Sequence, residues 1–337
     1  MSLADPMAEA LGLGSGTATI LLAIAGLLTV GTVKRGLWLL RSGADDADRR
    51  RWRSVLTWWV LFLLMGTVLV LGRGAVTLLM ASLSLLLLRE GLPLAGAESH
   101  RALAAVGVGA VYLWAWLDWT GLFLRAVPLL AAIWLLVELV GRWRSGPGLG
   151  RGRAVGRAVL LTVVGPSFVA GAASLPPPES LPTTGMGWLV LLAVLTELND
   201  SAQSWWGRNL GARQMAPRIS PRKTWEGLVG GLATTTLAAV LLAPLVTSYG
   251  RAAPSMAGGV DGTLGPPWLW SAALGLVVGL AGTAGDLSAS ILKRRAGVKD
   301  SGTLLPGHGG VLDRFDSLAV SAPVYFYVTW LLWHAAL

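Results

Sequence analysis

Long apolar runs separated by short charged loops constrain this sequence more than any other feature. An α-helix needs about twenty predominantly apolar residues to cross the roughly 30 Å hydrocarbon core of a membrane. The long runs are 16–33, 54–72, 102–123, 187–206, 227–248, 267–285 and 317–336, and the short ones are 75–88, 126–140 and 158–174. Two of the short runs need neighbouring helices or tilt to span. The sequence therefore predicts an all-α, polytopic integral membrane protein with ten transmembrane helices, nine being the alternative.

The composition excludes an ordinary soluble domain. The 337 residues are 54% hydrophobic and 13% charged, with a mean hydropathy of +0.62, whereas a soluble domain carries roughly twice that charged fraction. A net charge of +9 would suit nucleic acid in a soluble protein. Here the basic residues flank apolar spans, so we expect membrane lipids and no nucleic acid as partners. The absence of cysteine excludes disulfides and thiolate metal sites.

The basic residues also predict the orientation of the chain. With the N-terminus outside, 24 of the 27 Lys and Arg residues fall in loops on one side of the membrane, which the positive-inside rule makes the cytoplasmic side. The charged loops 207–226 and 290–316 both lie on that side. The sequence thus predicts a multi-pass protein of the inner (plasma) membrane with its functional site on the cytoplasmic face.

The few acidic residues point to a functional region near the C-terminus. The stretch 285–316 holds four aspartates, five Lys or Arg residues and one histidine. A carboxylate at the edge of an apolar segment is costly to desolvate and is usually functional. Carboxylates for a divalent cation beside basic residues for phosphate oxygens indicate a phosphate site. We therefore expect residues 1–180 to form lipid-facing or scaffold helices and residues 181–337 a transmembrane catalytic region.

Spacing relates the charged side chains of this stretch to one another. If helical, Asp286, Ser290 and Lys293 project from one face, at positions i, i+4 and i+7. Asp313 and Asp316 are three apart, so one helix can direct both carboxylates at a single site. His308 lies among glycines with no second histidine nearby. It suits a neutral hydrogen bond to phosphate or to a nucleotide base better than a zinc site.

Two upstream segments carry similar chemistry. Glu197 and Asp200 share a helical face beside Asn199, and either a functional role or a helix end reaching the interface explains them. In the segment 220–227, Ser220 is expected to cap the next helix and Pro221 to be its first residue. The free N–H groups of such a helix end, with Lys223 beside them, suit phosphate, so both interpretations can hold together.

The C-terminal stretch resembles the signature of a known enzyme family. The matching run is Ser290-x-Leu292-Lys293-Arg294-x4-Lys299-Asp300-x-Gly302-x2-Leu305-Pro306-x-His308-Gly309-Gly310-Val311-x-Asp313-Arg314-Phe315-Asp316. It is similar to the signature of the phosphatidate cytidylyltransferases, over 27 residues, with a looser similarity back to about Glu197. The Asn-Asp pair at 199–200 and the Ser-Pro-x-Lys-Thr-x-Glu-Gly pattern at 220–227 also have counterparts in that family.

The resemblance implies an activity and roles for individual residues. It implies transfer of the cytidylyl group of CTP to phosphatidate, with Mg²⁺ at Asp286 and Asp313 and room for a second cation. It places Ser290, Lys293 and Asp316 at the catalytic centre, and we add Asp300 and His308 to that set. The candidate substrate-binding residues are Asn199, Asp200, Ser220, Lys223, Thr224, Glu226, Arg294, Lys299, Gly309, Gly310 and Arg314.

Alternatives remain for the substrate and for the class of protein. A related enzyme could act on another lipid phosphate, such as an isoprenoid ether lipid or a polyprenyl phosphate. A secondary transporter also carries charges within the membrane, but its site lies near the midplane, whereas these charges gather at one face. A homodimer is a candidate assembly.

Overall fold

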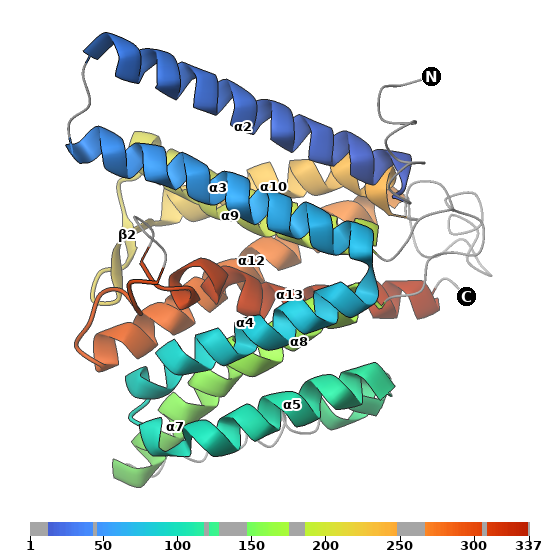
Figure 1. Cartoon of the computed structure of the whole chain (residues 1–337), viewed down its shortest axis with the longest axis vertical. Coiled ribbons are helices and arrows are strands. Elements are labelled where there is room, and N and C mark those ends of the chain that lie inside the picture. Colours follow the sequence, from blue (N-terminus) through green and yellow to red (C-terminus); the bar gives the residue numbers. More distant parts are fainter. Residues whose placement is uncertain are drawn as a thin grey trace.

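The computed structural model describes residues 13–42, 46–117, 121–127, 147–174, 186–247, 267–304 and 309–335. Helices form most of this part of the chain (Figure 1). The helices are α2 (Ser15–Ser42), α3 (Asp46–Leu71), α4 (Arg73–Leu94), the short 3-10 turn η1 (Glu98–His100), α5 (Arg101–Leu117), the π-helical turn η2 (Gly121–Ala126), α7 (Pro147–Val159), the π-helical turn η3 (Leu160–Val164), α8 (Gly165–Ala172), α9 (Met186–Leu210), α10 (Trp225–Val246), α12 (Pro267–Arg295) and α13 (Leu312–Ala335).

The polytopic α-helical class is confirmed. The run 126–140 lies almost wholly outside the described residues, and most of the described residues of every other predicted apolar run are helical. Within the described residues, five helical segments are long and apolar enough to cross a membrane: Ser15–Trp38, Arg73–Leu94, Gly152–Ala172, Trp225–Val246 and Trp268–Arg295. The total of ten spans therefore stays a prediction.

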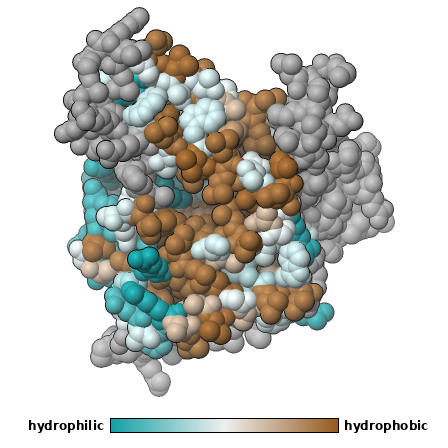
Figure 2. Space-filling model, viewed as in Figure 1, coloured by the Kyte–Doolittle hydropathy of each residue, from teal (hydrophilic) through white to brown (hydrophobic). Residues whose placement is uncertain are grey.

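The outer surface of the bundle matches a lipid environment. Large side chains such as Leu27, Leu78, Leu103 and Val106 are exposed. Figure 2 shows apolar residues over much of one face, with hydrophilic residues mainly at its left edge. In Figure 1 the strand β2, the C-terminal end of α12 and the loop leading to α13 lie at the same left end of the bundle. The polar groups thus gather at one end of an apolar bundle.

One expectation about the segment 220–227 is wrong. Ser220–Thr224 is a strand, β2, paired antiparallel with β1 (Gln214–Ala216). Helix α10 begins only at Trp225, and Thr224 is its cap, with the Gly227 N–H donating to Thr224 Oγ1 over 3.1 Å. Pro221 is tolerated because a short two-stranded hairpin has edges that need no ladder donor. The segment therefore extends from the helix end as a hairpin.

Close packing joins the four helices α9, α10, α12 and α13. A Cβ atom added at Gly275 of α12 would lie 2.7 Å from the Ala239 Cβ and 2.9 Å from the Thr235 carbonyl oxygen, both on α10. The next turn is equally close, because a Cβ at Gly279 would lie 3.0 Å from Asn199 Oδ1. Gly275 and Gly279 thus form a small-residue face on α12, which lets the helix backbones approach closely.

Aromatic residues connect the N-terminal helices to α13. Phe123 and Phe168 pack against Phe326 in tilted and edge-on geometry, with ring centroids 5.3 and 5.2 Å away, and Tyr327 Oη donates to the Phe123 carbonyl over 2.6 Å. These rings are close enough for favourable edge and offset contacts. The N-terminal and C-terminal regions therefore share one core.

We predict that Gly275→Ala weakens the bundle. The added methyl group would meet the Thr235 backbone, which cannot move aside as a flexible side chain would, so we expect a loss of about 1–3 kcal/mol in the free energy of unfolding. The measurement is the thermal unfolding midpoint in detergent. Gly31→Ala on α2 is the matched control, because no atom lies within 4 Å of its new Cβ. Equal midpoints for the two variants would contradict the close packing.

Candidate active site

A polar cavity of about 360 Å³ lies where α9, β2, α10, α12 and α13 meet. Its lining residues are Asp200, Gln203, Ser204, Ser220, Arg222, Lys223, Thr224, Gly227, Asp286, Lys293, Asp300, Asp313, Arg314 and Asp316. Five carboxylates and four cations thus share one small space. Such a convergence of charges in a membrane protein marks a site for a polar ligand.

One side of the cavity is formed by α12 and β2. Helix α12 continues past the predicted apolar run to Arg295, so Asp286, Ser290 and Lys293 are on one helix as the spacing predicts. Ser290 Oγ donates to Asp286 Oδ1 over 3.3 Å. On the opposite side of Asp286, the Lys223 ammonium of β2 lies 2.7 Å from Oδ2. Asp286 is therefore held between a hydroxyl group of its own helix and a cation of the hairpin.

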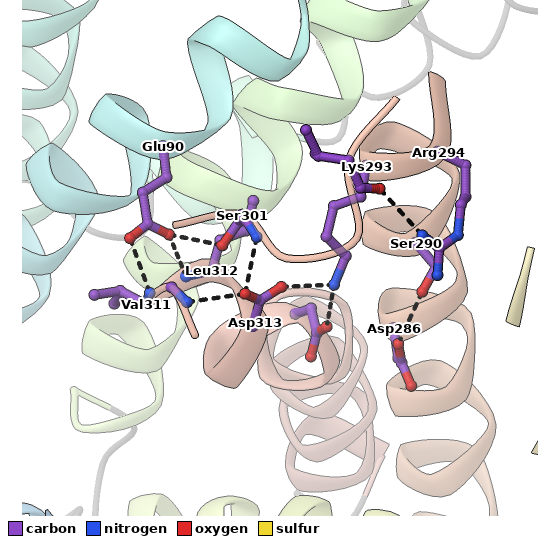
Figure 3. A network of polar contacts seen from close by, with 12 residues as sticks. Glu90, Asp286, Ser290, Lys293, Arg294, Ser301, Val311, Leu312 and Asp313 are labelled. Carbon is purple, nitrogen blue, oxygen red and sulfur yellow. Dashed lines mark hydrogen bonds and ion pairs between the residues drawn. The ribbon is translucent and has the colours of Figure 1, made fainter. Parts of the chain in front are cut away.

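Lys293 occupies the centre of the site. Its Nζ donates to Asp313 Oδ1 over 2.7 Å and lies 3.9 Å from Asp316 Oδ2. Lys293 is only 8% exposed and Asp316 only 7%. Figure 3 shows Asp313 beside the Lys293 ammonium group. Asp316 lies three residues further along α13 and approaches the same group. The pair thus shares one buried cation.

Asp313 also holds the loop that precedes α13. Its Oδ2 accepts hydrogen bonds from the N–H groups of Ser301 and Gly310, each over 2.9 Å. Partial burial alone raises the pKa of Asp313, but the bonds from Lys293, Gly310 and Ser301 outweigh it and hold this pKa below its usual value. Asp313 lies just before the apolar run 317–336, outside the membrane-spanning segment. Its lowered pKa keeps it ionised at neutral pH.

Several predicted site residues bind other parts of the protein. Asn199 is fully buried and donates to the Gly279 carbonyl over 3.2 Å. Glu226 accepts from the N–H groups of Ala212 and Arg213, and Arg294 donates to the carbonyls of Ile219 and Val298. The cavity lining does not include these three residues, nor Ser290, Lys299, Gly309 or Gly310. His308 lies outside the described residues.

The candidate list also omits residues that line the cavity. Arg222 belongs to the same hairpin strand as Lys223, and Ser204 is one helical turn beyond Asp200. Helical spacing from Asp200 would have found Ser204. Glu90 of α4 is also absent from the candidate list, and it contacts the loop before α13 from outside the cavity. Its place beside Arg89 in the sequence gives no sign of that contact.

The carboxylates fit a cation that the substrate helps to bind. No group of three His, Cys, Asp or Glu side chains suited to hold a metal occurs in the described part of the chain. Mg²⁺, however, is usually bound by one or two carboxylates together with substrate phosphates. The cavity supplies Asp200, Asp286, Asp313 and Asp316. Asp200 Oδ1 is buried and makes no hydrogen bond of ordinary geometry in the described structure, so an acceptor remains for a cation.

We predict that Lys293→Gln destabilises the protein strongly. The substitution leaves Asp313 and Asp316 beside each other without their shared cation. Breaking a buried ion pair on one side costs about 3 kcal/mol or more. Thermal unfolding in detergent measures the effect. Lys299→Gln removes the same charge from an exposed residue and should change stability by less than about 0.5 kcal/mol. An unfolding midpoint for Lys293→Gln that equals that of the control would refute the shared-cation interpretation.

Comparison with known proteins places the chain in a family. The model of the cytidylyltransferase family matches residues 52–332. The uncharacterized protein YnbB of Escherichia coli is 35% identical over 86% of this chain and 90% of its own length. The phosphatidate cytidylyltransferase of Brucella suis is 38% identical over 63% of this chain and 71% of its own, and that of Haemophilus influenzae is 36% identical over 43% and 46%. Because the family model covers most of its length, the chain belongs to the cytidylyltransferase family.

Proposed function

We propose that this chain transfers the cytidylyl group of CTP to phosphatidate, giving CDP-diacylglycerol and pyrophosphate. The observation that carries the proposal is the cavity itself, in which four cations and five carboxylates face one another at one end of an apolar helix bundle. Membership of the cytidylyltransferase family and relatives named phosphatidate cytidylyltransferase support the same activity. The protein is therefore a CTP-dependent nucleotidyltransferase of phospholipid synthesis.

The cationic side chains suit the phosphates of both substrates. Arg222 and Lys223 project from the hairpin, while Lys293 and Arg314 come from α12 and α13. Charge-assisted bonds from such groups to phosphate oxygens are strong. The volume of about 360 Å³ lies in the range of small-molecule sites. Arriving phosphates would compete with Asp286 for Lys223 and with Asp313 for Lys293.

The reaction requires positioning more than protein nucleophiles. An oxygen of the lipid phosphate attacks the α-phosphorus of CTP in line, a new P–O bond forms, and the bond from the α-phosphorus to the bridging oxygen breaks. Pyrophosphate leaves with that electron pair. In such phosphoryl-transfer chemistry, catalysis comes from holding the reacting atoms and neutralising charge. Lys223 of the hairpin and Lys293 of α12 both line the cavity and would supply both functions.

We assign Mg²⁺ as the cofactor, held by Asp286 and Asp313 together with substrate phosphates. Asp200 and Asp316 line the same cavity and leave room for a second cation. When bound, Mg²⁺ reduces the repulsion between carboxylates and phosphates and polarises the reacting phosphate. The proposal extends to the setting of the protein: ten spans, the inner (plasma) membrane, a site on the cytoplasmic face, and a homodimer as the assembly.

We predict Mg²⁺-dependent synthesis of CDP-diacylglycerol by the purified protein. Radiolabelled CTP and phosphatidate in mixed micelles should give labelled CDP-diacylglycerol and an equal amount of pyrophosphate. Chelation of divalent cations should abolish the product. ATP should substitute poorly, because a site that hydrogen-bonds cytosine leaves polar groups unpaired against adenine. Asp286→Asn, which removes one carboxylate at constant size, should be inactive at every Mg²⁺ concentration.

A lipid panel makes this assay decisive. Folded protein that transfers no cytidylyl group to any lipid phosphate would reject the enzymatic proposal. Preferential transfer to polyprenyl phosphate or to an isoprenoid ether lipid phosphate would retain the chemistry and change the substrate. Full activity of Asp286→Asn at low Mg²⁺ would remove Asp286 from the metal site.

We also predict which side of the membrane each loop faces. Because the chain has no cysteine, single cysteines can be introduced at Ser180, Ser255 and Lys299 and labelled in intact cells with an impermeant thiol reagent. The positive-inside rule predicts labelling at positions 180 and 255 and none at 299. Labelling at 299 alone would invert the topology and separate the cavity from cytosolic CTP. Permeabilised cells, in which all three should react, are the control.

A further inference from the structure

A buried carboxylate of the N-terminal region contacts the segment before α13. Glu90, on α4, is 6% exposed. Its Oε1 accepts from the Val311 N–H over 3.0 Å, and its Oε2 accepts from the Leu312 N–H over 2.9 Å and from Ser301 Oγ over 2.8 Å. Figure 3 shows the side chain reaching from α4 to this segment. Glu90 and Leu312 are 222 positions apart.

These contacts fall where a helix most needs an anion. The first N–H groups of α13 have no partner within the helix, and they carry the positive end of its dipole. An ionised acceptor makes stronger bonds there than a neutral one. Helix N-termini of this kind often bind phosphate. Because Glu90 takes the Val311 and Leu312 donors, these two N–H groups already have an anionic partner from within the protein.

Ser301 links Glu90 to the cavity. Its hydroxyl group donates to Glu90, and its N–H donates to Asp313 Oδ2 over 2.9 Å. The glycines of the segment fit around this arrangement. A Cβ at Gly302 would lie 2.8 Å from Glu90 Oε1, and one at Gly310 would collide with the Glu90 carboxylate and the Ser301 hydroxyl. The carboxylates of Glu90 and Asp313 thus both hold the loop at Ser301.

We propose that Glu90 is a positioning residue for the transferase reaction. It fixes the loop around Ser301 and the first turn of α13, and through them the direction in which Asp313 faces Lys293 and the cavity. This role rests on the proposed function of that cavity. It gives α4 a positioning role in the reaction, although the sequence predicts only a lipid-facing or scaffold role for residues 1–180.

The test compares Glu90→Gln with Glu98→Gln. Glutamine keeps the size of Glu90 but loses its charge, and its NH2 group would face a backbone N–H donor. Amide hydrogen exchange of Val311 and Leu312 should become about tenfold faster or more, since each loses a charge-assisted bond. In the same protein kcat should fall about tenfold or more, with the KM for CTP and for phosphatidate within about threefold of wild type.

The control removes an acid of the same type from a neighbouring segment. Glu98 is exposed and lies 3.9 Å from Arg101, and within the described residues it forms no hydrogen bond or ion pair with the loop before α13. Glu98→Gln should leave both exchange and kcat within about twofold of wild type. If Glu90 serves folding alone, Glu90→Gln should give less folded protein with a normal kcat per folded molecule. That result, or unchanged exchange at Val311 and Leu312, overturns the proposal.

Two further outcomes are distinguishable. If Glu90→Gln does not fold, Ser301→Ala removes only the hydroxyl contact; a fall in kcat of about threefold supports the link, and a change below about twofold rejects it. If the wild-type protein transfers no cytidylyl group, the proposed function fails, while the exchange comparison still decides whether Glu90 fixes the loop.

Discussion

The site depends on the cost of placing charges beside an apolar core. Lys293 is almost fully buried at the end of α12, and an ammonium group there is stable only with carboxylates around it. Asp313 and Asp316 provide them from α13. The same need pairs Lys223 of the hairpin with Asp286. These two pairs connect α12 to the elements on either side, so the charges that suit phosphate chemistry also hold the end of the bundle together.

Small residues let the helices that carry these charged side chains pack close together. Helices α12 and α13 approach so closely that a Cβ at Gly285 would collide with the Asp316 carbonyl oxygen. Polar side chains can then form hydrogen bonds directly from one helix to the next. Gln203 Nε2 donates to Thr283 Oγ1 over 2.7 Å, and Thr196 Oγ1 lies 3.0 Å from Ser321 Oγ. Close packing replaces the hydrophobic driving force that lipid does not supply between membrane helices. The carboxylates are therefore carried by a rigid frame.

Sequence reasoning worked where a local rule decides the structure. Apolar runs predict helices because the membrane sets their length, and helical spacing relates Asp286 to Lys293. It failed at Ser220, because cap preferences at Ser220 and Thr224 are similar and only the pairing with Gln214–Ala216 selects the later start. The same reasoning predicts a substrate role for Asn199, and the structure adds that its amide joins α9 to α12. It gave Glu90 no role, because no local pattern predicts a contact between residues 222 positions apart.

The network around Ser301 bears on how a protein of this kind can be divided. Among the residues that the structure describes, all those that line the cavity follow position 199, so a fragment containing only the C-terminal helices would retain this lining. That fragment would nevertheless lose Glu90, and the amides of Val311 and Leu312 would face water or lipid in its place. It would also lose Phe123 and Phe168, which pack against Phe326. The N-terminal helices are thus not an interchangeable anchor: a hybrid that takes them from another membrane protein must supply an acid at the same height of the bundle.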